Sequence, residues 1–455
     1  MKRSSIQSSL VQSHQTSASY KPYAVFQQSP SYSWFTLGNL FYNLGQQMLS
    51  VAVGWQVFEQ THSLLNLGFI GLALWLPVVL FTIPSGYLAD HYSRKKIVLV
   101  SQLILMFCSL GLLFMTSYPF YFIPRMPWIA SKNNPSSTFP INWFYLILFL
   151  NGSAQAFNDT SKQSLFPELV TPQLLNSAIT WNSSIFQLSS VIGPALGGFL
   201  ITIFGCTGVY WITSCCSLIF IICLFCVRHN HTPTISPVFQ FQNLWSGIRF
   251  IKKEKIILAT ITLDLFAVLF GGAIALLPAF AQKVLHCGAI GLGWLRAAPA
   301  IGACLMSIIL THLPPLKKAG PLLIFSVIGF GIATIIFGFS HFFILSFLML
   351  LFTGILDNIS VVIRATLIQI LTPNTMRGRV TSISYIFIHS SNDLGGFESG
   401  LAAFLFGLQF SVVLGGIGCV LAVLVAAWIW PEIWKLNSLH QAHLKESPPP
   451  TFAKI

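Results

Sequence analysis

A few ionisable side chains of this chain lie inside long apolar stretches, where packing alone does not explain a charge. They are Asp264, Arg296, Asp357, Arg364, Asp393 and Glu398. A charge at the centre of a bilayer costs ~2.5–3.5 kcal/mol on membrane-insertion scales, so such residues usually serve a substrate or ion pathway. We expect them to act in transport or proton coupling, and we expect no catalytic residue.

The depth of these side chains suggests which of them meet. With a rise of ~1.5 Å per helical residue, Asp264 lies ~10 Å from one face of the membrane and Arg364 lies about as deep, so we expect an ion pair. Asp357 and Asp393 both fall near ~20 Å, where two carboxylates cannot both ionise easily, which suits a proton carrier. Each residue could equally hold helices together or lock one conformation. Glu398 lies nearer the opposite face.

Uncharged amides form a second group. They are Asn39, Asn43, Gln46 and Gln47 in the stretch 34–58, and Asn151, Gln155 and Asn158 in the stretch 142–160. Residues three, four or seven apart share one face of a helix. Such amides can bind a polar substrate in a cavity or bridge neighbouring helices, and the sequence favours neither alternative. Trp55 is the aromatic candidate for stacking on a substrate.

The composition requires a membrane. Of the 455 residues, 54% are hydrophobic and only 8% are charged, whereas soluble domains carry about 25% charged residues. The net charge of +13 would indicate nucleic acid in a soluble protein, but a bias of Lys and Arg toward cytoplasmic loops explains it here. We expect the lipid bilayer and a small-molecule substrate as partners, and no nucleic acid.

Cysteine and phosphate-binding patterns exclude several classes of protein. The nine cysteines mostly lie inside apolar stretches, without the spacing of a disulfide framework or a metal site. The sequence contains no phosphate-binding loop of the ATPase type. We therefore expect no metal and no cofactor, and we expect protons rather than ATP to supply the energy.

Twelve apolar stretches position these residues. They are 34–58, 66–86, 97–117, 142–160, 178–204, 208–227, 257–281, 290–311, 321–339, 342–366, 380–406 and 409–430. A membrane-crossing helix needs ~20 residues, and a polar segment divides the stretches six and six. The predicted fold class is an all-α membrane protein with 12 transmembrane helices in two pseudo-symmetric six-helix bundles.

The predicted domains follow from this division. They are a disordered cytoplasmic N-terminus (1–31), an N-terminal six-helix bundle (32–228), a cytoplasmic linker (229–256), a C-terminal six-helix bundle (257–432) and a cytoplasmic tail (433–455). The linker places Phe241, Leu244, Trp245, Ile248 and Ile251 on one helical face, which predicts an amphipathic helix along the membrane surface.

The basic residues orient the chain. With the N-terminus inside, nineteen Lys and Arg fall on the inner side and only Arg125, Lys132 and Lys283 fall outside. Cytoplasmic segments of membrane proteins carry the excess of Lys and Arg. We expect both termini in the cytoplasm.

The two halves repeat one another. Gly68 and Gly71 match Gly288 and Gly291 at an offset of 220 residues, and Gly193, Gly198 and Gly205 match Gly395, Gly400 and Gly407 at an offset of 202. The long connection 118–141 accounts for the difference. A duplicated six-helix unit with parallel halves is typical of one large class of secondary transporters.

Several motifs resemble those of the major facilitator superfamily. Gly86, Asp90 and Arg94 stand four residues apart in the turn 86–96, as in the signature between the second and third helices of that superfamily. Arg377 and Arg379 resemble the equivalent basic turn of the second half. Gly193-Pro194 resembles the second part of the antiporter motif, although Thr180 and Ser189 replace its first glycines.

The resemblance extends over about residues 32–432. The segments 55–61, 263–278 and 391–400 are similar to the enterobactin-exporter and macrolide-efflux branch. In that reading, Gly86 permits tight packing, Asp90 lies near the N-terminus of the helix 380–406, and Arg94 reaches Asp159. These contacts are expected to latch the cytoplasmic side shut in an outward-open state.

The resemblance implies a proton-coupled exporter of a small amphiphilic molecule, siderophore-like or drug-like. The protein is expected to work by alternating access, as a monomer, in the bacterial inner membrane. An importer or a lipid flippase of the same fold is the closest alternative. A non-transporting membrane sensor and a membrane-bound acyltransferase are alternatives from other classes.

Overall fold

The computed structural model describes residues 23–117, 141–228, 248–313, 318–373 and 376–434. For residues 83, 377–379, 382, 385, 386 and 389 it describes the backbone alone. The described residues form helices and turns, with no strand among them. The connection 118–140, the first residues of the linker and most of both predicted tails lie outside these ranges.

The long helices follow the apolar stretches. They are α3 (Pro30–Thr61), α4 (Leu64–His91), α5 (Arg94–Ser117), α6 (Ile141–Leu165), α7 (Leu175–Cys226), α9 (Lys255–Phe270), α11 (Gly288–His312), α12 (Ala319–Phe339), α13 (Phe343–Leu371), α14 (Arg377–Phe406) and α15 (Leu408–Ile429). Short helices α2 (Ala24–Gln28), η1 (Phe166–Leu169), η2 (Pro172–Leu174), η3 (Ala273–Leu276), α10 (Leu277–Lys283) and η4 (Pro431–Ile433) lie between or beside them.

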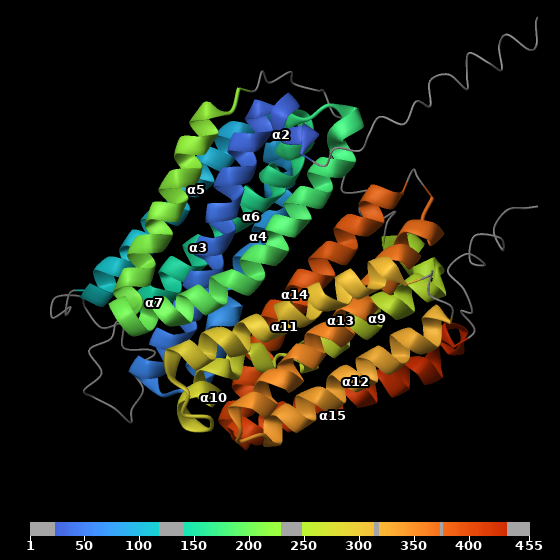
Figure 1. Cartoon of the computed structure of the whole chain (residues 1–455). Coiled ribbons are helices and arrows are strands. Elements are labelled where there is room, and N and C mark those ends of the chain that lie inside the picture. Colours follow the sequence, from blue (N-terminus) through green and yellow to red (C-terminus); the bar gives the residue numbers. More distant parts are fainter. Residues whose placement is uncertain (1–22, 118–140, 229–247, 314–317, 374–375, 435–455) are drawn as a thin grey trace, which may run out of the picture.

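The helices form two groups, which Figure 1 shows as a blue-to-green and a yellow-to-red group. In the first bundle, α3 to α7, helix α3 packs against α7, and α6 packs against α4 and α5. In the second bundle, α9 to α15, helix α13 packs against α11 and α12, and α15 packs against α9 and α12. Helix pairs α4–α14 and α7–α11 join the two bundles.

Two matching glycines turn the chain at corresponding places. α7 contains 52 residues, which as a straight helix would measure ~78 Å, far more than the ~30 Å apolar core of a bilayer. Gly205 interrupts it with φ 67° and ψ −178°. Gly407, its predicted repeat partner, separates α14 from α15 with φ 91° and ψ 160°. A positive φ is easily adopted only by glycine, so this part of the repeat is confirmed.

One predicted helix is broken. The stretch 257–281 was expected to be continuous, but α9 ends at Gly271 and the chain continues through η3 into α10. Glycine has a low helix propensity, and two in succession favour a break. A Cβ on Gly272 would meet the Gly395 carbonyl oxygen of α14 at 2.5 Å, so the break also lets α14 approach closely.

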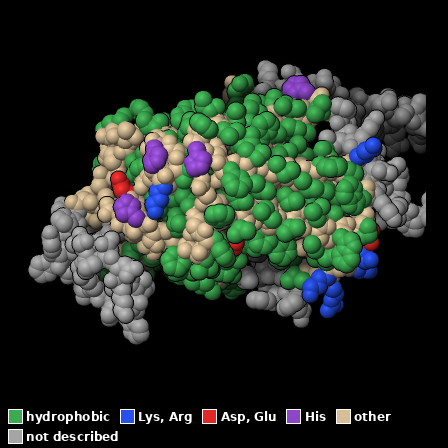
Figure 2. Space-filling view, turned by 90° about the horizontal axis from the view of Figure 1, so that it is seen from below, with side chains coloured by type: hydrophobic (Ala, Val, Ile, Leu, Met, Phe, Trp, Pro, Cys, Tyr) green, Lys and Arg blue, Asp and Glu red, His purple; other side chains and the backbone are tan. Residues whose placement is uncertain are grey.

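Eight stretches of the described chain are long and apolar enough to span a membrane. They include the stretch Pro172–Cys226, whereas α3, α6 and α14 are not among them. Figure 2 shows one face on which hydrophobic side chains cover the middle and Lys, Arg and His side chains gather toward the edges. This distribution suits a surface that meets lipid at its centre and water at its ends.

The two ends of the molecule differ in how the bundles meet. We call them the α3–α4 end, where the turns 62–63, Gly205 and Gly407 lie, and the α4–α5 end, where the turn 92–93 lies. A Cβ on Gly400 would meet the Gly68 Cα atom of α4 at 2.4 Å, and a Cβ on Gly198 would meet the Ala289 carbonyl oxygen of α11 at 2.3 Å. The bundles therefore touch backbone to backbone toward the α3–α4 end.

The predicted disordered N-terminus is partly wrong. Within 1–31, α2 is ordered, Val25 is fully buried, and the Phe26 ring stands edge-on to Trp181 with centroids 5.1 Å apart. Aromatic packing against α7 explains this order. In the linker, residues 248–253 are helical and Ile251 is buried, while Phe241, Leu244 and Trp245 lie outside the described residues.

Candidate functional site

The second bundle buries an ion pair. Arg364 of α13 contacts Asp264 of α9 through Nη1 and Oδ2, as their depths predicted. Both residues are less than 10% exposed. The guanidinium also donates through Nε to the Ser360 carbonyl oxygen at 3.3 Å, one turn back on the same helix. Removing one partner of such a pair would leave an uncompensated charge in a low dielectric, so the pair holds α9 to α13.

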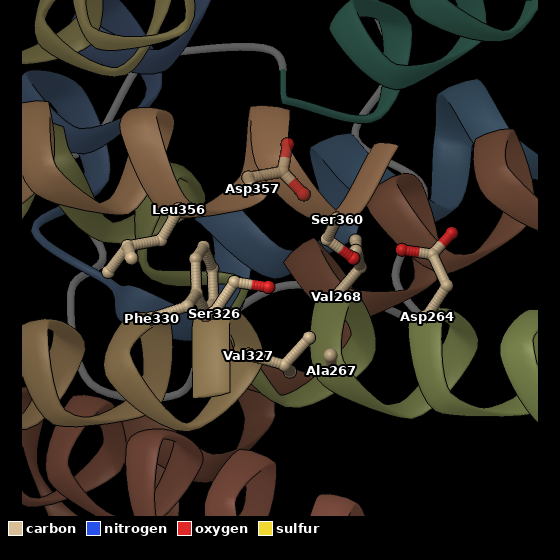
Figure 3. Close-up of a pocket in the computed structure, with 9 residues that line it drawn as sticks. All are labelled: Asp264, Ala267, Val268, Ser326, Val327, Phe330, Leu356, Asp357 and Ser360. Carbon is tan, nitrogen blue, oxygen red and sulfur yellow. The ribbon is translucent and has the colours of Figure 1, made fainter. Parts of the chain in front are cut away.

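A pocket lies beside this pair, inside the second bundle. Its lining residues come from α9, α12 and α13: Asp264, Ala267, Val268, Ser326, Val327, Phe330, Leu356, Asp357 and Ser360. Figure 3 shows two carboxylates and two serine hydroxyls around otherwise apolar walls. The Ser360 side chain stands between those of Asp357 and Asp264 in that view. Asp264 and Asp357 thus share a polar pocket that sequence reasoning did not foresee.

The predicted pairing of Asp357 with Asp393 is not found. Asp357 lines the pocket between α9, α12 and α13. The backbone of Asp393 lies elsewhere, against α4: its carbonyl oxygen would be 2.6 Å from a Cβ placed on Gly71. No hydrogen bond or ion pair joins the two carboxylates in the described structure. Equal depth fixes the level of a residue in the membrane but not the direction in which its helix presents it.

Glu398 and Arg296 have separate surroundings. Glu398 Oε2 accepts a hydrogen bond from Ser399 Oγ at 3.4 Å. Arg296 of α11 donates across the bundles, from Nη1 to the Ser50 carbonyl oxygen of α3 at 3.2 Å and from Nη2 to Ser50 Oγ. Among the described residues no carboxylate forms an ion pair with Arg296.

The amides of the first bundle mostly bridge helices. Gln155 Nε2 donates to Gln46 Oε1 at 2.9 Å, which joins α6 to α3. Gln47 Nε2 donates to Ser190 Oγ of α7 at 3.4 Å. Asn158 is wholly buried and accepts from Gln102 Nε2 of α5 at 3.0 Å, so it is not a cavity group.

The remaining predicted cavity residues lie in the same bundle. Asn151 is buried and its Nδ2 has no hydrogen-bond partner among the described residues. Asn43 is half-buried. Trp55 is half-buried and packs against the core cluster around the α3–α4 end rather than standing free.

The turn 86–96 is tied to its own bundle. The predicted contact between Arg94 and Asp159 is not found. Arg94 instead pairs with Glu168 of η1. Its guanidinium also lies 3.9 Å from the Asp90 carboxylate and donates to the Ser164 carbonyl oxygen at 3.0 Å. Asp159 instead pairs with Lys162 at 3.3 Å, one turn further along α6. Glu168 was missed, although it was an acidic residue on the expected inner side and close to the end of the stretch 142–160.

The tight packing predicted at Gly86 is absent in this structure. Among the described residues nothing lies within 4 Å of a Cβ placed on Gly86, because the bundles meet at the opposite end. By contrast, a Cβ on Gly193 would meet the Gln47 Cβ at 2.5 Å, and the Pro194 carbonyl oxygen would lie 2.6 Å from a Cβ on Gly293. The side chains of Arg377 and Arg379 lie outside the described residues.

Two helical bundles with glycine contacts between them and charges inside one of them are the architecture of a major facilitator transporter. Comparison with known proteins agrees. The sequence profile of the transmembrane secretion effector family matches residues 20–454, and the chain belongs to this family. The family consists of transporters rather than enzymes, so the lipid bilayer and a small-molecule substrate are its partners.

The chain has low sequence identity to its curated relatives and to solved structures. It is 25% identical to the enterobactin exporter EntS of Citrobacter koseri over 340 residues, which are 74% of this chain and 76% of that protein. The Escherichia coli exporter gives 24% over the same length. In structure it resembles an inward-facing, unoccupied bacterial homolog of the lysosomal transporter Spinster, with a TM-score of 0.64 and 15% identity over 94% of this chain and 99% of that chain.

A nucleoside transporter shares the same architecture. NupG has a TM-score of 0.68 and 12% identity, and the match covers 88% of this chain and 99% of that chain. Identities this low show the fold alone. The protein is therefore a multi-pass integral membrane transporter of the major facilitator superfamily, distantly related to bacterial enterobactin exporters.

Proposed function

We propose that this protein is a proton-coupled secondary transporter that exports a small amphiphilic molecule, siderophore-like or drug-like, by alternating access. The observation that carries the proposal is the buried pair of Arg364 and Asp264 beside a second carboxylate, Asp357, in one pocket. A proton that reaches this pocket can neutralise either carboxylate. Neutralising Asp264 removes the charge that holds Arg364, which loosens α9 from α13.

Two further features support export by exchange with protons. The curated relatives are named as exporters of enterobactin. Gly193 and Pro194, which resemble part of the antiporter motif, bring α7 against α3 and α11 with close contacts. Asp393 and Glu398 on α14 remain candidates for coupling, because α14 contacts α4 of the other bundle.

We further propose that the chain crosses the membrane twelve times. The eight apolar stretches supply nine crossings when the stretch around Gly205 is counted twice, and α3, α6 and α14 supply the other three. Their polar side chains are acceptable inside a bundle where amides bond to one another, as Gln155 does with Gln46. The halves would then be 32–228 and 257–432, in the bacterial inner membrane.

The orientation follows from the distribution of charge. In the described chain the α4–α5 end carries Arg94, Lys95, Lys96, Lys162, Arg249, Lys252, Lys253 and Lys255, and the α3–α4 end carries Lys283. The α4–α5 end is then cytoplasmic, together with both termini. Since the bundles touch toward the opposite end, the structure is interpreted as closed to the outside and inward-open.

Flux measurements in inverted membrane vesicles test the proposal. Labelled enterobactin should accumulate in vesicles that contain the protein when their interior is acidic, and an ionophore that collapses the gradient should abolish accumulation. Asp357→Asn should strongly lower gradient-driven uptake, because an amide cannot take up the proton that the carboxylate accepts. Glu432→Gln, a carboxylate on the surface next to Lys255, is the matched control and should transport normally.

Other results would redirect the interpretation. Uptake that is the same with and without the proton gradient would exclude proton antiport. Accumulation in right-side-out vesicles would favour an importer. Undiminished flux in Asp357→Asn and Asp264→Asn would discard the pocket as the coupling site.

A second variant tests the latch predicted at the turn 86–96. Asp90→Asn should leave the protein folded, because Asp90 lies 3.9 Å from Arg94 and a stronger partner, Glu168, remains. Transport should nevertheless slow if Asp90 faces the N-terminus of α14 when the α4–α5 end closes. Unchanged flux would assign the turn to the stability of the first bundle alone.

A further inference from the structure

Arg296 lies on the seam between the two bundles. It belongs to α11 of the second bundle, and its guanidinium donates to both the carbonyl oxygen and the hydroxyl of Ser50 on α3 of the first bundle. One turn further along α3, a Cβ placed on Gly54 would lie 3.9 Å from Arg296 Nη1 and 3.1 Å from the Pro278 Cγ of α10. The glycine therefore lets Pro278 pack closely against α3, and the guanidinium lies beside this contact at an ordinary van der Waals distance.

The charge of Arg296 is not balanced by its surroundings. Arg364, inside α13, has Asp264 as a counter-ion, but no acidic side chain of the described chain pairs with Arg296. An arginine side chain does not lose its proton in a protein, and it carries five N–H donors. The bonds to Ser50 engage two of them with neutral acceptors. A half-buried cation therefore keeps unused donors between the bundles.

We propose that Arg296 binds a carboxylate, or another planar anion with two oxygens, on the transported molecule, and that Ser50 is its resting partner. The fork of N–H groups matches two carboxylate oxygens, and such charge-assisted pairs are stronger than bonds to a neutral hydroxyl. The substrate class is then anionic rather than merely amphiphilic. This inference rests on the proposed transport function and names the substrate chemistry of that function.

Binding at Arg296 has a consequence for the closed end. The bonds from Arg296 to Ser50 join α11 to α3, beside the glycine contacts that close the α3–α4 end. An anion that takes these donors releases one connection between the bundles. Occupancy therefore weakens the closure that the empty transporter maintains, which is the direction of change that export requires.

Equilibrium dialysis of the full chain in detergent tests the inference without a gradient. The probes are labelled salicylate and its neutral analogue salicylamide, which differ in charge and little in shape. The carboxylate should bind about tenfold more tightly than the amide, as expected for one charge-assisted pair. Arg296→Gln should reduce salicylate binding to the level of salicylamide, and Arg296→Lys should retain part of the difference.

Two further variants separate recognition from general effects. Ser50→Ala removes the competing acceptor and should strengthen salicylate binding by a few fold. Lys283→Gln removes another cation that reaches across to α3, at 5.2 Å from the Phe58 ring centroid, and should bind both probes like the unaltered protein. The melting temperature of each variant shows that it is folded.

The opposite results would overturn the inference. One is a lack of salicylate binding at millimolar concentration. Another is that Arg296→Gln binds salicylate as tightly as the unaltered protein. A third is that Lys283→Gln loses as much salicylate binding as Arg296→Gln. Weaker binding in Ser50→Ala would refute the exchange of partners. If Arg296-dependent binding is present but vesicle flux ignores the proton gradient, then only the proposed coupling fails.

Discussion

The two bundles share a helical plan but fill their interiors with different chemistry. In the first bundle, buried polar side chains are uncharged and bond to one another, as Gln102 does with Asn158 and Gln155 with Gln46. In the second bundle, the pocket between α9, α12 and α13 contains carboxylates, one of them paired with Arg364. Neutral amides keep the same bonds at any pH, whereas carboxylates change charge when protons bind.

This difference suggests a division of labour. Under the proposed proton coupling, the first bundle would act as a scaffold whose amide contacts do not depend on protons, and the second would contain the groups that respond to the gradient. Arg296 and Ser50 join the two at their seam. The comparison predicts that substitutions inside the second bundle change both stability and coupling, while substitutions inside the first change stability modestly.

The largest effect is expected at the buried ion pair. Arg364→Gln leaves Asp264 buried without a counter-ion and should cost about 3–5 kcal/mol of folding free energy. The double substitution Asp264→Asn with Arg364→Gln removes both charges and should recover most of that loss. Thermal unfolding of the purified proteins in detergent, followed by tryptophan fluorescence, measures both. A single variant that melts like the unaltered protein would contradict the assignment.

Some of this site could be predicted from the sequence, and the reason is geometric. Position along a helix gives depth, and depth brought Asp264 and Arg364 together correctly. The repeat of Gly205 and Gly407 was readable from their spacing, and both glycines are needed because a positive φ with ψ near 180° is open almost only to glycine. What the sequence does not contain is the rotation of each helix about its axis.

The errors come from that missing rotation. Asp357 and Asp393 share a depth but have different neighbours, and Asn158 faces α5 rather than a cavity. Arg94 finds Glu168 rather than Asp159 because η1 folds back beside the turn 86–96. The break at Gly271 depends on the approach of α14 to Gly272, a tertiary contact that local propensity only permits.

The next effect concerns the seam between the bundles. Gly400→Ala places a Cβ against the Gly68 Cα of α4, and forcing backbones apart typically costs about 1–3 kcal/mol. It should lower the melting temperature and open the α3–α4 end. Among the described residues Gly86→Ala meets nothing within 4 Å, and it should leave the melting temperature unchanged or raise it slightly, because alanine favours a helix more than glycine does. If Gly86→Ala also slows flux, then the α4–α5 end closes tightly at Gly86 in another state of the cycle.

A smaller effect is expected for an amide of the first bundle. Gln155→Leu removes one hydrogen bond to Gln46 and should cost about 1 kcal/mol, with flux maintained. Gln46→Leu, on the other side of the same bond, should give a similar loss. A large drop in flux with an unchanged melting temperature would instead show that Gln155 contacts substrate, and would weaken the contrast between the bundles.

The smallest effect is expected at the edge of the first bundle. Glu168 and Arg94 form an ion pair that is partly exposed, with 32% and 16% of their side chains accessible. Exposed pairs contribute about 0.2–1 kcal/mol and weaken in salt, so Glu168→Gln should lower the melting temperature slightly at low ionic strength and hardly at all at high ionic strength.

Asp159→Asn is the control, because Asp159 pairs with Lys162 rather than Arg94. If Asp159→Asn lowers the melting temperature more than Glu168→Gln does, the result would favour the pairing of Arg94 with Asp159 that the sequence predicted. A loss in Glu168→Gln that persists in salt would mean that charge, and not amides alone, also holds the first bundle together.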